Sequence, residues 1–248
     1  MLHILARLPT HTEEIDMDLG LKDKVAIVTG GTEGIGKETA AVLAREGAKV
    51  AICSRRPAAV EAAAKELERA GADVLGVPAD VSKPEDLSRL VEATLKRFGR
   101  VDILVNNAGT SKRGAFMEND DAVWAADFES KVFGAIRLSK LVIPHMRKVG
   151  GGRIINVTNI GAKTPAAGST PTSISRAAGI ALTKAMSKEF APENILVNTV
   201  CIGRIKSGQH ERRFAKSGES AESYYAKAGK DIPMGRVGET IEAANAIV

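Results

Sequence analysis

The chain is poor in cysteine and has no long run of apolar residues. Only two of its 248 residues are cysteine, Cys53 and Cys201. Both lie within short apolar runs, so we expect reduced, buried thiols in a reducing compartment rather than a disulfide framework. No apolar run approaches the roughly 20 residues that span a bilayer. These absences predict a soluble, cytoplasmic protein without a membrane partner, and no metal site is expected.

The chain also lacks a strong imbalance of charge. It carries 35 Lys and Arg residues against 30 Asp and Glu residues, for a net charge of +5. Acidic and basic residues interleave, which indicates a solvated surface and no nucleic-acid partner. Residues 1–19 have neither the apolar core nor the cleavage site of a secretory signal, so we expect a flexible N-terminal extension.

From residue 20 onward, short β-branched runs alternate with amphipathic stretches. Strands are predicted over 24–29, 49–53, 73–77, 102–105, 153–158 and 195–200, and helices over 35–46, 58–70, 84–98, 120–148 and 172–190. This alternation is typical of βαβ units. It predicts a single α/β domain over 20–248 with a Rossmann-type, doubly wound parallel sheet in three layers. A ligand crevice is expected at the carboxyl ends of the strands.

A glycine-rich loop follows the first predicted strand, with the sequence Thr-Gly-Gly-Thr-Glu-Gly-Ile-Gly over 29–36. Glycines allow a tight turn and a close approach of the backbone to a pyrophosphate, and the next helix offers unpaired N–H donors. The loop therefore predicts a nucleotide-binding site that includes Gly30, Thr32, Gly34, Ile35 and Gly36.

Three motifs in this order resemble the short-chain dehydrogenase/reductase family: the glycine loop, Asp80-Val81 after strand three, and Asn-Asn-Ala-Gly over 106–109. The resemblance runs from about Lys24 to the C-terminus. It implies strand order 3-2-1-4-5-6 extended by a seventh strand, a carbonyl or alcohol substrate, and a homo-oligomer, either a dimer or a tetramer. It also implies cofactor contacts by Asp80, Val81, Asn107, Ala108, Gly109, Arg176, Gly203 and Ser207.

The end of the second strand indicates which cofactor is preferred. An acidic residue there would bind a free ribose, whereas Ser54-Arg55-Arg56 offers a hydroxyl and arginine forks to a 2′-phosphate. We therefore expect NADP(H) rather than NAD(H), with Ser54 and Arg55 as contacts. Two alternatives remain: Arg56 could cap the next helix, and Glu33 stands where NADP-preferring relatives often have a basic residue, an effect that Lys37 could offset.

The resemblance also implies the positions of four catalytic groups, and all four are substituted. Lys131 stands at the asparagine position, Asn159 at the serine, Thr172 at the tyrosine and Arg176 at the lysine. The chain would thus be a divergent member without the usual Asn-Ser-Tyr-Lys tetrad.

The chemistry of these four residues differs from that of the usual tetrad. Thr172 is far less acidic than a phenol, Arg176 keeps its charge, and the amide of Asn159 can polarise a carbonyl. If Lys131 is buried beside Arg176, its pKa falls toward a useful range, so we hypothesise that Lys131 supplies the proton directly or through water. The alternative is an inward-facing structural cation or a snorkelling side chain.

The segment 204–236 resembles the family's variable substrate loop and is rich in basic residues, which would favour an anionic substrate. It contains His210, Arg212, Arg213, Lys216, Tyr224, Tyr225, Lys227 and Lys230. A tyrosine here could replace the missing phenol, or the segment could be a solvated lid helix. The chain ends at Val248, after a helix expected near Glu239, so the family's C-terminal strand is expected to be missing.

Three functions fit this sequence. The first is an NADP(H)-dependent oxidoreductase that moves hydride between nicotinamide and a carbonyl or alcohol substrate with a non-standard proton donor. The second is a catalytically silent nucleotide-binding relative, and the third is a non-redox enzyme derived from the family, such as a lyase or a dehalogenase-like member.

Overall fold

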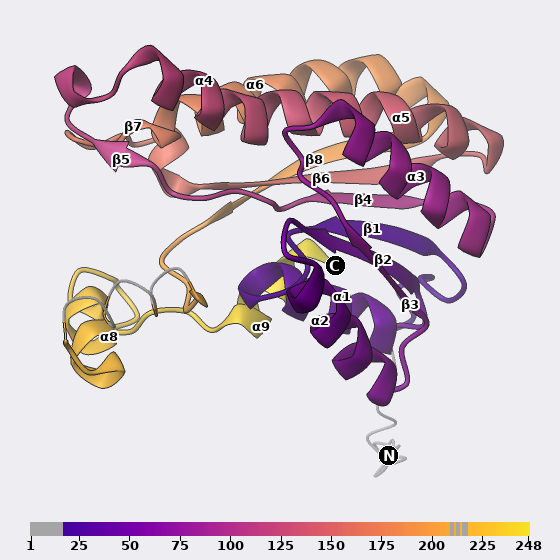
Figure 1. Cartoon of the computed structure of the whole chain (residues 1–248), viewed down its shortest axis with the longest axis horizontal. Helices are drawn as coiled ribbons and strands as arrows, with labels where there is room; N and C mark the ends of the chain where they lie inside the picture. Colours follow the sequence, from indigo (N-terminus) through magenta and orange to yellow (C-terminus); the bar gives the residue numbers. More distant parts are fainter. Residues whose placement is uncertain (1–16, 209–210, 212–213, 215–217) are drawn as a thin grey trace, which may run out of the picture.

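A six-stranded parallel sheet forms the centre of the protein (Figure 1). The computed structural model describes residues 17–208, 211, 214 and 218–248. The strands are β1 Val25–Thr29, β2 Lys49–Ser54, β3 Val74–Pro78, β4 Ile103–Asn106, β6 Gly152–Asn159 and β8 Ile195–Ile202. Their order, β3-β2-β1-β4-β6-β8, is the predicted 3-2-1-4-5-6 arrangement. Within the described residues this sheet has no seventh strand.

Some predictions fall on parts of the chain outside the described residues. They concern residues 1–16 of the expected N-terminal extension and, in the expected substrate loop, His210, Arg212, Arg213 and Lys216.

Helices cover both faces of the sheet and make the three predicted layers (Figure 1). One face carries α1 Gly34–Arg45, α2 Pro57–Arg69 and α9 Thr240–Ile247, and the other carries α3 Pro84–Phe98, α5 Gly134–Lys148 and α6 Thr172–Phe190. Successive residues of β1 alternate between the two cores, with Ile27 in one and Ala26 and Val28 in the other. Because successive strand side chains point to opposite faces, a strand covered on both sides is apolar throughout.

The helix predicted over 120–148 is interrupted. It consists of α4 Asp121–Phe128, a π-helical turn η2 Glu129–Phe133, and α5. Asp120 caps α4 by accepting a hydrogen bond from the Val123 amide at 2.8 Å. A π-helical turn changes the phase of the helix and is often found at functional sites. This one carries Lys131.

Smaller elements lie at the two edges of the sheet and in the C-terminal region. They are the ribbon of β5 Arg113–Gly114 and β7 Thr170–Pro171, the helix α8 Ala221–Gly229, and the short turns η1 Phe116–Glu118, η3 Ile160–Ala162 and η4 Ala191–Glu193. The helix expected near Glu239 is α9, which begins with a capping box between Glu239 and Glu242.

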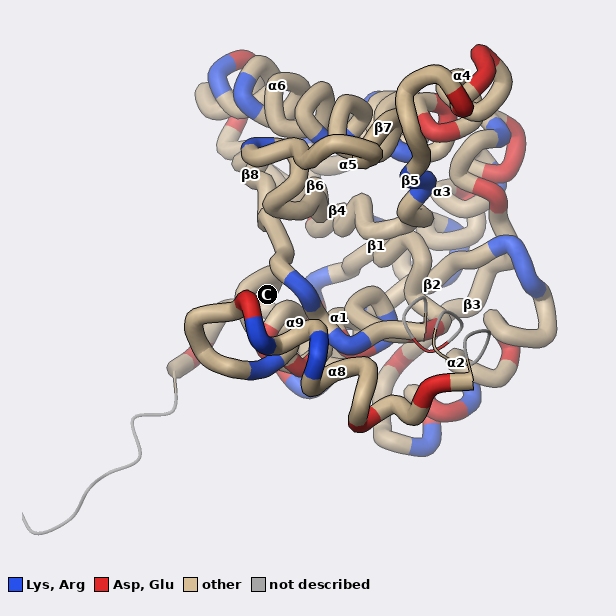
Figure 2. Tube along the Cα trace, turned by 90° about the vertical axis from the view of Figure 1, so that its left-hand side faces the viewer, with Lys and Arg blue, Asp and Glu red and all other residues tan. Residues whose placement is uncertain are grey.

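The distribution of charged residues and the hydropathy of the helices both bear on the expectations from the sequence. Acidic and basic residues interleave along most of the trace (Figure 2). Among the described residues, no helix is both long and apolar enough to cross a membrane.

Candidate active site

A cavity of about 1280 Å³ runs along the carboxyl ends of the strands. It extends from the glycine loop, past the end of β2, to the end of β6 and the start of α6. All the predicted cofactor contacts lie on its wall: Gly30, Thr32, Gly34, Ile35, Gly36, Ser54, Arg55, Asp80, Val81, Asn107, Ala108, Gly109, Arg176, Gly203 and Ser207. Small-molecule sites commonly have volumes of roughly 300–1,000 Å³, so this cavity can hold an extended ligand.

The glycine loop leaves no room for larger side chains at its tightest point. A Cβ atom on Gly36 would lie 2.3 Å from the Gly30 carbonyl oxygen and 2.4 Å from the Asn107 amide nitrogen. Gly30 and Gly34 have φ angles of +65° and +56°, in the left-handed region that favours glycine. The sequence therefore fixes a backbone that a dinucleotide can approach closely at the start of α1.

Thr29 joins the glycine loop to the loop after β4. Its hydroxyl accepts hydrogen bonds from the backbone amides of Asn107 and Ala108, both at 3.0 Å. In return, the Asn107 side chain donates to the Thr29 carbonyl at 2.9 Å. The Asn-Asn-Ala-Gly segment thus holds together the two strand ends that form the cavity floor.

The turn after β2 carries two arginines, and they differ in whether they form an ion pair. Arg56 pairs with Glu33 at 3.4 Å, and Lys37 pairs with Glu66 at 2.6 Å. Arg55 is exposed and has no ion pair within the described part of the chain. The Ser54 hydroxyl is buried and has no hydrogen-bond partner in that same part. Ser54 and Arg55 therefore fit a phosphate ester, while Arg56 rather than Lys37 balances the charge of Glu33.

Two other predicted cofactor contacts, Asp80 and Ser207, lie in loops at the edge of the cavity. The Asp80 carboxylate accepts from the Ser82 amide at 3.0 Å and from its hydroxyl at 2.7 Å, which holds the loop after β3. Ser207 lies beside the glycine loop, since a Cβ atom on Gly34 would be 3.7 Å from that of Ser207.

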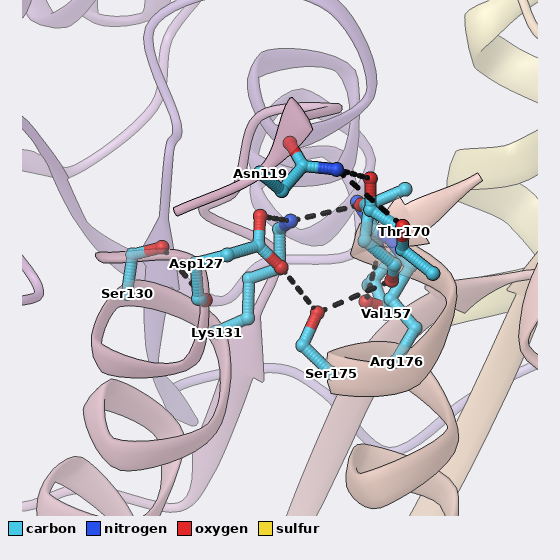
Figure 3. Close-up of polar contacts among 9 residues, drawn as sticks. Asn119, Asp127, Ser130, Lys131, Val157, Thr170, Ser175 and Arg176 are labelled. Atoms are coloured by element: carbon cyan, nitrogen blue, oxygen red, sulfur yellow. Dashed lines mark hydrogen bonds and ion pairs between the residues drawn. The ribbon is translucent and has the colours of Figure 1, made fainter. Parts of the chain in front are cut away.

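A buried group of polar side chains lies where η2 meets the start of α6 (Figure 3). The Lys131 ammonium forms an ion pair with the Asp127 carboxylate and donates to the Thr172 hydroxyl at 2.9 Å. The side chains of Lys131 and Asp127 are 6% and 1% exposed. Lys131 is therefore an inward-facing cation and does not snorkel to solvent.

Burial lowers the pKa of Lys131 to about 8, because removal from water disfavours the ammonium form. The Asp127 carboxylate opposes this change through its hydrogen bond and charge, whereas the positive charge of Arg176 adds to it. Lys131 can therefore change protonation state near neutral pH.

Arg176 lies next to Lys131, across from the loop after β4. A Cβ atom on Gly109 would lie 3.6 Å from both the Arg176 Nη2 and the Lys131 Cε atoms. Arg176 donates from Nη1 to the Val157 carbonyl at 3.3 Å, while its buried Nε has no partner among the described residues. Burial lowers the pKa of Arg176 and the charge of Asp127 opposes this shift. Arg176 still keeps hydrogen-bonding capacity for a ligand.

Asn159 lies at the last position of β6, on the wall of the large cavity together with Thr172 and Arg176. Its amide makes no hydrogen bond to another side chain in the described residues. The four residues at the predicted catalytic positions therefore lie near one end of the cavity. Lys131 contacts Thr172 and lies beside Arg176, while Asn159, Thr172 and Arg176 line the cavity wall.

Two polar residues of this cluster are absent from the sequence-based site. Asp127 binds Lys131, and its second oxygen accepts from the Ser175 hydroxyl at 2.6 Å. Asp127 precedes Lys131 by four residues, a spacing at which helical side chains meet. That spacing was the available signal, but such pairs also occur on exposed helix faces, so it does not reveal burial.

The two tyrosines lie away from this cluster. Tyr224 and Tyr225 pack against Phe214 with ring centroids 5.6 and 5.9 Å away. Neither lines the large cavity in the described structure. Among the described residues, neither phenol therefore lies at the cluster of Lys131 and Thr172.

The sheet order and the glycine loop define a Rossmann-type α/β protein. A family model for short chain dehydrogenases matches residues 24–218. The chain therefore belongs to the short-chain dehydrogenase family, whose members are oxidoreductases acting on carbonyl or alcohol substrates.

Relatives and solved structures agree with this assignment. Human dehydrogenase/reductase SDR family member 4 is 39% identical over 188 residues, which are 75% of this chain and 68% of the relative. The NADPH and L-sorbose complex of L-sorbose reductase from Gluconobacter frateurii has a TM-score of 0.88 and 33% identity, and the match covers 93% of this chain and 90% of that one.

A second solved structure is the NADPH-bound short chain oxidoreductase from Pseudomonas aeruginosa PAO1, described as containing an atypical catalytic center. It has a TM-score of 0.85 and 34% identity, with coverage of 91% of this chain and 88% of that one.

Proposed function

We propose that the protein is an NADP(H)-dependent oxidoreductase in which Lys131 provides the proton that the family's tyrosine usually provides. The observation that carries this proposal is the buried Lys131 ammonium, which donates to Thr172 at the wall of the cavity. When bound, NADPH would supply the hydride for a carbonyl substrate. The bound NADPH in both structural neighbours supports this choice of cofactor.

The proposed cofactor contacts divide the cavity into two ends. The glycine loop would accept the pyrophosphate, and Ser54 with Arg55 would hold the 2′-phosphate because both residues line the cavity and Arg55 is exposed there. Arg176 would bind the nicotinamide ribose or an anionic group of the substrate through its guanidinium, because the residue lines the cavity. The Asn159 amide would donate to the substrate carbonyl.

The proposal is tested first by cofactor titration. NADPH should bind more tightly than NADH, and a panel of carbonyl compounds should then reveal a substrate that oxidises NADPH. Failure to bind either cofactor would exclude an oxidoreductase of this kind.

The Arg55→Asp variant tests the phosphate contact. The Kd for NADPH should rise by about tenfold or more while the Kd for NADH stays within a few fold of wild type, because only NADPH places a phosphate charge beside this residue. Equal weakening of both cofactors would remove the assignment. Lys65→Ala, on the exposed face of α2, serves as the control.

A catalytically silent relative is the second candidate. The specific observation in its favour is that Lys131 and Asp127 satisfy each other as a buried ion pair, which a structural role alone could require. Tight NADPH binding without turnover across a broad panel would favour this candidate.

The remaining proposals concern the substrate, the oligomeric state and the cellular location of the protein. We propose a small carbonyl or alcohol substrate, with an anionic group favoured by Arg176, and a homo-oligomeric assembly. A cytoplasmic location fits the two free cysteines, Cys53 and Cys201.

A further inference from the structure

Lys131 is separated from the large cavity by another side chain. Lys131 lines a smaller cavity of about 30 Å³, and it is not among the described residues on the wall of the large one. Thr172 does lie on that wall and accepts from Lys131 at 2.9 Å. Two residues on the wall of the large cavity therefore contact the ammonium, Asp127 and Thr172, and of these only Thr172 carries a hydroxyl that can pass a proton on.

The Thr172 hydroxyl has a hydrogen to give. A threonine hydroxyl is one donor and two acceptor sites, and Lys131 occupies an acceptor site. Among the described residues, no acceptor receives the hydrogen of this hydroxyl. An oxygen atom of a ligand in the large cavity could accept the hydrogen bond that the Thr172 hydroxyl has to donate.

Asp127 fixes the position of the ammonium. One carboxylate oxygen accepts from Lys131, and the other accepts from Ser175 at 2.6 Å. Ser175 is 1% exposed and belongs to α6, three residues after Thr172. Helix α6 therefore carries both the Ser175 hydroxyl that holds the carboxylate and the Thr172 hydroxyl that Lys131 contacts.

We propose that Thr172 relays the proton from Lys131 to the substrate oxygen, and that Asp127, held by Ser175, is a positioning residue that keeps the Lys131 ammonium on Thr172. This inference rests on the proposed function. A threonine hydroxyl is too weakly acidic to be the proton source itself. In this inference Thr172 only passes the proton on, and Lys131 is the acid that supplies it.

The proposed step balances in protons and electrons. Hydride from the reduced nicotinamide reaches the carbonyl carbon, and the C=O electron pair moves to oxygen. That oxygen takes the hydroxyl proton of Thr172 while the Thr172 oxygen takes a proton from Lys131. The products are an alcohol, the oxidised nicotinamide and a neutral Lys131 amine, which solvent reprotonates.

Two variants of Thr172 test the relay. Thr172→Val keeps the branched shape but removes the hydroxyl, so the single-turnover rate of hydride transfer should fall by about 10²–10⁴-fold, the range of general acid catalysis. Thr172→Ser keeps a hydroxyl and should stay within about tenfold of wild type. The Kd for NADPH should be the same in both. A wild-type rate in Thr172→Val would overturn the relay.

Asp127→Asn tests the positioning role without a need for turnover. Removal of the carboxylate charge should lower the pKa of Lys131 by about one unit or more, as read by NMR of the lysine side chain in the cofactor-free protein. The alkaline limb of the pH–rate profile should move to lower pH by the same amount. An unchanged pKa and profile would overturn the role of Asp127.

Ser175→Ala provides the test if Asp127→Asn does not fold. It removes the hydrogen bond to the second carboxylate oxygen and the longer one to the Thr172 backbone carbonyl, at 2.6 and 3.1 Å, and keeps the Asp127 charge, so kcat should fall several-fold while KM stays unchanged. An unchanged kcat would contradict the inference.

A third variant separates this inference from the proposed function. If Lys131→Ala is inactive but Thr172→Val is not, the relay fails and the proposed proton source stands. If Lys131→Ala is fully active, the proposed proton source itself fails.

Discussion

Lys131 combines burial with partial compensation of its charge. A lysine whose side chain is 6% exposed would normally lose its proton readily, yet the Asp127 carboxylate favours the ammonium form through its hydrogen bond and its charge. The pKa of about 8 results from this opposition. General acids work best when their pKa lies near the operating pH, so the environment suits Lys131 to proton transfer.

The pH dependence of the two reaction directions should be opposite. Carbonyl reduction needs the protonated ammonium, so its rate should fall as the pH rises through about 8. Alcohol oxidation needs the neutral amine, so its rate should rise through the same pH. Initial rates in both directions from pH 6 to about 10 measure this, and parallel profiles would contradict the assignment.

The glycine loop and the π-helical turn are the two elements that shape the site. The loop brings backbone to the cavity floor, and the turn places Lys131 inward next to the start of α6. Each element works through backbone geometry, so its effect can be tested with small substitutions.

Gly36→Ala should damage both stability and cofactor binding. The added Cβ would lie 2.3 Å from the Gly30 oxygen, a backbone atom that cannot rotate away. Overpacking of this kind costs about 1–3 kcal/mol, and NADPH affinity should fall with it. Denaturant unfolding and NADPH titration measure the two effects.

Gly179→Ala on α6 is the matched control. Its added Cβ would meet only the Thr158 Cγ2 atom, at 3.6 Å, an ordinary contact. Alanine is also the better helix former, so stability should stay the same or rise. A larger loss in Gly179→Ala than in Gly36→Ala would contradict this account of the loop.

The elements differ in how far the sequence predicts them. The strands are apolar on both faces, so their runs could be predicted from composition and alternation, whereas their order was implied only by the family resemblance. The helix over 120–148 reads as continuous, because the π-helical turn itself contains no glycine or proline and the glycine that follows it, Gly134, is tolerated within a helix. Asp127 and Ser175 were missed for a related reason: their burial depends on how η2 and α6 pack, which periodicity along one helix does not contain.

At the scale of the whole molecule, one edge of the sheet collects groups from distant parts of the chain. The loop after β1, the turn after β2, the π-helical turn and the start of α6 all reach the large cavity or the cluster behind it. Their positions depend on the parallel sheet, which directs every strand end to the same edge.

The buried Lys131 should also make the free energy of unfolding depend on pH. Its pKa is about 8 in the folded protein against an ordinary 10.5, so between these values the unfolded chain binds more protons. The free energy of unfolding should therefore gain a positive contribution as the pH rises from about 8 to about 10.5. The difference in Tm between wild type and Lys131→Met across this range measures it, and a pH-independent difference would contradict the lowered pKa.

The most direct test of the central claim is the rate of NADPH-dependent carbonyl reduction in Lys131→Ala, compared with Lys140→Ala, an exposed lysine on α5. Lys131→Ala should lose about 10²–10⁴-fold in rate at saturating NADPH, while NADPH affinity and the rate of Lys140→Ala stay near wild type. A wild-type rate in Lys131→Ala would show that the proton comes from another group.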